Sequence, residues 1–60
     1  MLTTYEFYVA QADGAEPRFV PVLCESEREL VRRARELLGE KNAAFVEVRR
    51  AGQPLFRLDR

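Results

Sequence analysis

The chain of 60 residues has no histidine and only one cysteine, Cys24. Without histidine there can be no Ser-His or Cys-His pair and no histidine-ligated metal. A lone cysteine cannot form an internal disulfide, and it fits a reducing compartment. Neither a glycine-rich phosphate loop nor a C-x-x-C or EF-hand spacing is present. These absences predict a protein that is not an enzyme and that holds no cofactor and no metal.

The chain also lacks an excess of charge, because ten basic residues balance ten acidic ones. Affinity for nucleic acid comes from neutralising several phosphates, so this balance argues against a non-specific polyanion binder. No apolar run approaches the roughly 20 residues of a membrane span. The opening segment, residues 1–6, lacks the basic and then apolar pattern of a signal peptide. We therefore expect a cytoplasmic protein without membrane association.

The residues that are present have a globular composition, with 47% hydrophobic and 33% charged residues. The length predicts a single small domain over residues 1–60. Such a chain buries only about 60% of the surface that its unfolded state exposes, which makes its stability marginal. Small domains usually gain stability from disulfides, a metal or oligomerisation. Since the first two are excluded, we expect a homo-oligomer, in the simplest case a dimer.

The clearest local signal predicts a helix over residues 26–38. Ser26 as N-cap and Glu29 three positions later form a capping box. Glu29 and Arg33 are spaced to form a favourable ion pair. Gly39 is predicted to end the helix in the left-handed conformation. The apolar residues share one stripe along this helix: Leu30, Val31, Ala34, Leu37 and Leu38.

Two strand-like runs stand on each side of this helix. They cover residues 4–10, 18–23, 44–50 and 55–58, where β-branched and aromatic residues are frequent. Asp13-Gly14 predicts a hairpin of type I′ after the first strand, and Ala51–Gln53 predicts a turn after the third. Pro21 cannot donate a hydrogen bond to a neighbour, so the second strand is expected at an edge of the sheet. Its apolar residues occupy both faces, so the sequence does not determine which face of this strand points toward the core.

The order β-β-α-β-β predicts an α+β fold, a four-stranded antiparallel sheet with one helix packed on one face. The strand order is left open, because two hairpins around a helix permit several arrangements. The helix is expected to pack on Tyr5, Phe7, Val9, Val46, Val48, Phe56 and Leu58. In the third strand, Ala44 is assigned to this same face. The other face is then expected to carry Glu6, Tyr8, Ala10, Phe45, Glu47, Arg49, Leu55 and Arg57.

This open face mixes aromatic residues with arginine, which is typical of protein interfaces. An ordinary solvated face is the other interpretation, because an antiparallel sheet can expose one side to water. We favour a non-catalytic interaction module that self-associates through the open face or an edge. Apolar contacts are expected from Tyr8, Phe45 and Leu55, and Arg49 and Arg57 are expected to pair with Glu6 and Glu47. The candidate interface is Tyr8, Phe45, Glu47, Arg49, Leu55 and Arg57.

An alternative function is a small nucleic-acid-associated regulator. Arg28, Arg32 and Arg35 share one side of the helix at i, i+4 and i+7 spacing. Glu29 and Glu36 interrupt this basic surface, so a solvated, salt-bridged helix face is the simpler interpretation.

Cys24 precedes the helix, where a thiol can acquire a lowered pKa and become reactive. Acidic neighbours and the lack of a base favour a different role, as a small apolar residue that closes a strand.

Several segments together resemble a known family. The aromatic strand of residues 5–9, the Asp13-Gly14 turn, the Glu/Arg/Ala/Leu-rich helix and the closing stretch of residues 46–58 resemble DUF6894, a family of small bacterial proteins of unknown function. The closing stretch carries most of the resemblance, with a V-x-V-R strand, a turn and a Pro-Leu pair. The resemblance implies a fold but no activity. A weaker resemblance is to the sheet-and-helix domain of HicB-type antitoxins, whose Pro-x-Leu-x-Gly-Cys segment has only a partial counterpart at residues 21–24.

Overall fold

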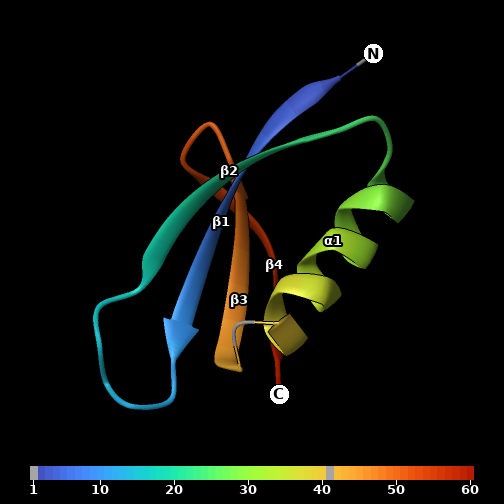
Figure 1. Ribbon diagram of the computed structural model, residues 1–60. Coiled ribbons are helices and arrows are strands. Elements are labelled where there is room, and N and C mark those ends of the chain that lie inside the picture. The colour runs from blue at the N-terminus through green and yellow to red at the C-terminus, as the bar shows by residue number, and fades with distance from the viewer. Residues whose placement is uncertain (1, 41) are drawn as a thin grey trace.

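The computed structural model describes residues 2–40 and 42–60, which form four strands and one helix (Figure 1). The elements are β1 (Thr3–Gln11), β2 (Arg18–Cys24), α1 (Glu27–Glu40), β3 (Ala43–Arg50) and β4 (Gln53–Asp59). All strand pairs are antiparallel, and α1 lies between β2 and β3 in the chain. The predicted α+β fold of order β-β-α-β-β is therefore confirmed.

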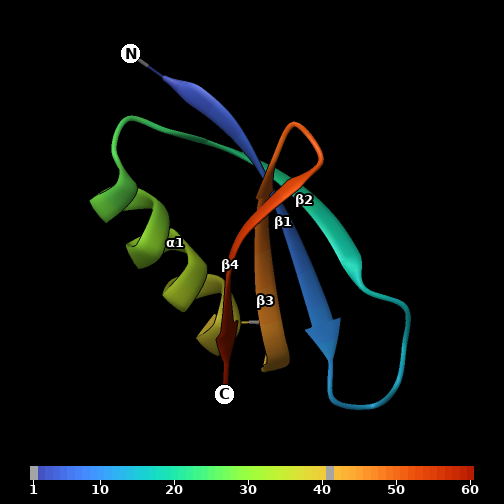
Figure 2. The same cartoon turned by 180° about the vertical axis from the view of Figure 1, so that it is seen from behind.

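The strands are ordered β2-β1-β3-β4 across the sheet, so the two hairpins lie side by side with β1 and β3 in the centre (Figure 2). Phe7 of β1 pairs with Val20 of β2 on one side and with Val48 of β3 on the other. Strand β2 forms one edge of the sheet, as Pro21 predicted. Strand β4 forms the other edge.

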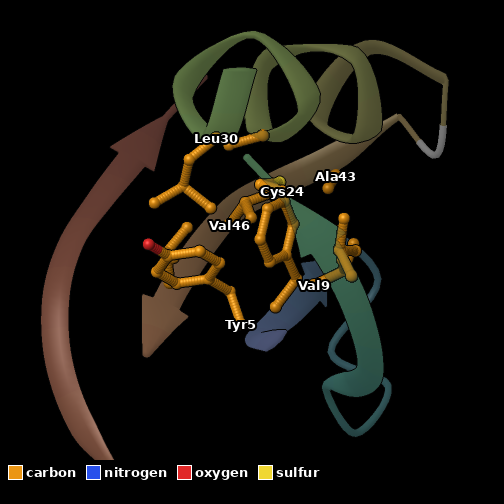
Figure 3. Close-up of a cluster of buried hydrophobic side chains, with 10 residues drawn as sticks. Tyr5, Val9, Cys24, Leu30, Ala43 and Val46 are labelled. Atoms are coloured by element: carbon orange, nitrogen blue, oxygen red, sulfur yellow. The ribbon is translucent and has the colours of Figure 1, made fainter. Parts of the chain in front are cut away.

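The hydrophobic core lies between α1 and one face of the sheet (Figure 3). Phe7, Val9, Val46 and Val48 are almost fully buried, and Leu30 reaches them from the helix. Burying each such side chain contributes about 1.5–3 kcal/mol. The core members on this face are those predicted from β1, β3 and β4, except that Ala43 takes the place of Ala44, and Phe56 and Leu58 are partly buried. Strand β2 adds Val20, Val22 and Cys24 to the core. These three residues define the inward face of β2, which the sequence did not determine.

The start of α1 agrees with the prediction, but its end does not. The backbone N–H of Glu29 donates to Ser26 Oγ at 3.2 Å, which forms the expected N-cap. Gly39 does not adopt the left-handed conformation, because the helix continues to Glu40. Asn42 takes that conformation instead, with φ of 51°, and its N–H donates to the carbonyl of Gly39 at 3.2 Å. Asparagine tolerates this region because its short polar side chain bonds locally.

The two hairpin turns differ from each other. After β1, only Gly14 has a positive φ, and residues 12–17 form a longer loop in which Asp13 Oδ1 accepts from the Ala15 N–H at 2.9 Å. The expected type I′ turn at Asp13-Gly14 is therefore wrong. After β3, Ala51 and Gly52 have φ of 51° and 83°, and Arg50 pairs with Gln53. This second turn has the two-residue geometry that type I′ requires.

Two register shifts change which side chains face the helix. Between β1 and β3, Ala10 pairs with Phe45 and Gln11 pairs with Ala43. Ala44 is thus an extra residue, and the fully buried Ala43 fills the core where Ala44 was expected. Between β3 and β4, a second shift separates the Val48–Phe56 and Arg49–Pro54 pairs and leaves Leu55 as the extra residue.

Candidate functional site

The face of the sheet opposite α1 carries two groups of aromatic and arginine side chains, one made of Phe19, Tyr8 and Arg49 and one made of Phe45 and Arg57. The rings of Tyr8 and Phe19 meet edge to face, with centroids 5.4 Å apart and an interplanar angle of 74°. The guanidinium carbon of Arg49 lies 4.5 Å from the centroid of the Tyr8 ring. That of Arg57 lies 3.8 Å from the centroid of the Phe45 ring. We call these five residues the aromatic–arginine ladder, and it draws on all four strands.

The ladder arises because side chains on one face of a sheet meet their direct and diagonal neighbours. Tyr8 is paired directly with Phe19, and Arg49 lies diagonally across from Tyr8 because its own partner is Glu6. Each cation–π contact contributes about 0.5–1 kcal/mol at an exposed site. The contacts therefore orient the guanidinium groups more than they stabilise the fold.

Each arginine of the ladder also pairs with a carboxylate two residues away on its own strand. Arg49 Nη2 lies 3.0 Å from Glu47 Oε1, and Arg57 Nη2 lies 2.9 Å from Asp59 Oδ1. The hydrogen bond with Glu47 raises the pKa of Arg49 further. Arg49 therefore pairs with Glu47, one of the two expected carboxylates, but along its own strand, whereas the expected pairing of Arg57 with Glu6 or Glu47 is wrong. Glu6 instead accepts from the N–H of Gly52 at 3.3 Å.

The structure brings most of the predicted interface residues together. Tyr8, Phe45, Glu47, Arg49 and Arg57 share the open face. Leu55 does not belong with them, because it lines a hollow on the helix side together with Tyr5 and Leu30. The register shift at Val48/Arg49 is the cause, since an extra residue in β4 breaks the simple alternation of faces.

Three exposed residues of β2 extend the open face, and the sequence did not assign them to it. Phe19 and Leu23 are each 54% exposed, and Pro21 lies exposed between them. The sequence does contain a pattern that predicts this arrangement. Apolar residues stand at the alternate positions 20, 22 and 24, and all three face the core in the structure. Taking Cys24 as a core residue would have placed Phe19 and Leu23 on the opposite face.

The alternative nucleic-acid surface consists of Arg28, Arg32 and Arg35, which are exposed on α1. The helix sequence ERELVRRARELLGE holds as many glutamates as arginines. Arg33 also approaches Glu36 at 3.9 Å, a pair in place of the expected one with Glu29. No specific contact or charge excess thus favours this surface.

Cys24 lies in the core, only 1% exposed. Its burial, followed by the nearby charge of Glu29, raises the pKa of the thiol above its ordinary value. A thiol in this state is a poor nucleophile. Over residues 2–40 and 42–60, no three His, Cys, Asp or Glu side chains come together as a metal site would require.

Comparisons of the chain with protein-family models, with curated proteins and with solved structures found no match. The described part of the chain contains no helix with the length and apolar character needed to cross a membrane. The role of the open face is therefore inferred from its own geometry and charge.

Proposed function

We propose that this protein is a non-catalytic interaction module that forms a homodimer through its open sheet face. The aromatic–arginine ladder is the observation that supports this function. It joins tyrosine, phenylalanine and arginine, the residue types enriched where proteins meet. The exposed Phe19 and Leu23 add apolar surface beside it. A second copy would remove this surface from water.

The charge pattern of the face favours a second copy over a polyanion. Arg49 and Arg57 each have a carboxylate beside them, so positive and negative groups alternate across β3 and β4. A two-fold axis brings a surface against itself, which requires that kind of self-complementary pattern. A nucleic acid would need an excess of positive charge that this face lacks.

The size of the face predicts a weak dimer. Strands lie about 4.8 Å apart and rise about 3.3 Å per residue, so four strands of this length cover roughly 400–500 Å² per protomer. Stable interfaces bury about 800 Å² per partner. We therefore expect a reversible dimer whose population rises with protein concentration.

The test is the solution mass, measured by light scattering after size exclusion over a wide range of concentrations. The wild-type mass should rise from monomer toward dimer, and Phe19→Glu should remain a monomer throughout. Phe19 is 54% exposed, so this change should leave the core intact. Leu55→Glu is the matched control, because Leu55 is 49% exposed and lines the other side of the sheet.

The control variant should dimerise like the wild type. Phe45→Glu, on the central strand β3, should also give a monomer. A wild-type protein that stays monomeric at every concentration would contradict the dimer. A dimer that survives both Phe19→Glu and Phe45→Glu would exclude the open face as its interface.

A further inference from the structure

The other side of the sheet contains a hollow of about 340 Å³ between the first turns of α1 and the hairpin of β3 and β4. Its apolar lining consists of Leu30 and Val31 from the helix and Leu55 and Phe56 from β4. This volume lies at the small end of ligand sites, which are mostly apolar with a few polar groups. A molecule smaller than a typical drug-sized ligand matches that size.

Tyr5 supplies a polar group inside this hollow. The residue is only 9% exposed, and its hydroxyl points away from the centre of the core (Figure 3). No hydrogen bond joins that hydroxyl to any residue in the described part of the chain. The hydroxyl oxygen is accessible to solvent, since within residues 2–40 and 42–60 the only buried side-chain nitrogen or oxygen without a hydrogen-bond partner is Arg49 Nε. The hydroxyl of Tyr5 is thus available to a ligand.

Two residues of opposite charge also line the hollow, Arg50 and Glu27. Both are exposed, and neither forms an ion pair with another residue in ranges 2–40 and 42–60. The register that pairs Glu6 with Arg49 brings Tyr5 beside Arg50. Guanidinium and hydroxyl donors at neighbouring positions suit a carboxylate, which arginine binds through two parallel hydrogen bonds. Glu27 suits an ammonium group.

We propose that this hollow binds a small zwitterion with an apolar side chain, such as an apolar α-amino acid. The carboxylate is held by Arg50 and Tyr5, and the ammonium group by Glu27. The side chain of the ligand packs between the helix and β4, against Leu30, Leu55 and Phe56. The hollow and the aromatic–arginine ladder lie on opposite sides of the sheet, so this inference does not depend on the proposed dimer.

The first experiment titrates L-phenylalanine into ¹⁵N-labelled protein and follows the amide signals by NMR. A ligand of this size is expected to bind with a Kd on the order of 1 mM. The largest shifts should occur at Tyr5, Arg50 and Leu55. Two analogues test the charges, because 3-phenylpropionate lacks the ammonium group and 2-phenylethylamine lacks the carboxylate. Each should bind several-fold more weakly.

Variants assign the contacts. Arg50→Gln and Tyr5→Phe should each weaken binding about tenfold, as the loss of a charge-assisted hydrogen bond does. Tyr5→Phe keeps the ring that fills the core, so the domain should fold. Arg57→Gln, on the open face, is the matched control and should bind like the wild type. The Phe19→Glu variant should also bind normally, which separates this test from that of the dimer.

Three results would overturn the proposal. The first is an absence of shifts at ligand concentrations well above the expected Kd. The second is binding that neither Arg50→Gln nor Tyr5→Phe weakens. The third is a set of shifts at the hollow that follows protein concentration without ligand, because a second copy would then occupy it.

Discussion

Replacing Ala51 by asparagine should stabilise the domain. Ala51 has φ of 51° and Gly52 has φ of 83° at the turn between β3 and β4. The left-handed conformation costs a residue with a Cβ about 1–2 kcal/mol. The cost is smaller for asparagine, because its side chain can form a local hydrogen bond. Asn-Gly is the preferred pair for a two-residue type I′ turn. We expect a gain of about 0.5–1 kcal/mol in the free energy of unfolding.

A change of 1 kcal/mol shifts the Tm of a domain of this size by roughly 4–8 °C, so the expected increase is about 2–8 °C. Thermal unfolding followed by circular dichroism at fixed protein concentration measures it. Ala12→Asn is the matched control, because Ala12 is exposed in the first loop and has no positive φ. It should change the Tm little. An unchanged or lower Tm for Ala51→Asn would refute the assignment of strain to this turn.

Two further predictions concern the helix and the core. Ser26→Ala should lower the free energy of unfolding by about 1 kcal/mol, because the 3.2 Å bond from the Glu29 N–H to Ser26 Oγ is lost; an unchanged urea midpoint would contradict it. The pKa of Cys24 is raised above its ordinary value of 9.0, so the unfolded chain releases this proton at lower pH than the folded protein. Stability should therefore fall as the pH rises through about 9, and urea unfolding at several pH values should show a shallower decline for Cys24→Ala.

The helix start and the central strands could be predicted because their signals are local. Ser26 and Glu29 need only each other to form a cap, and the alternation around Phe7 needs only an extended chain. The helix end could not be predicted in the same way, because glycine at position 39 permits the left-handed conformation without requiring it. The N–H of Asn42, two residues after the end of the helix, donates to the carbonyl of Gly39 instead.

The open face was predicted for β1 and β3 but not for the two edge strands. Strand β2 is apolar on both sides, and only its pairing with β1 shows that Phe19 faces Tyr8. In β4, alternation alone places Leu55 outward, because it cannot anticipate an extra residue. The partners of the arginines could not be predicted, because each arginine can pair either with a carboxylate across the sheet or with one two residues away on its own strand. The structure has the second arrangement for both Arg49 and Arg57.

The central position of β1 has a consequence for the synthesis of the chain. The hairpin of β1 and β2 can form as soon as both strands have left the ribosome, but a two-stranded hairpin alone is marginally stable. Phe7 and Val9 gain their neighbours Val48 and Val46 only when β3 has been made. The inner edge of β1 therefore stays unpaired until translation has passed β3, although α1 is made earlier and can already approach the apolar side of the hairpin. The complete sheet should form only after β3 has been made, when the two hairpins meet along the seam between β1 and β3.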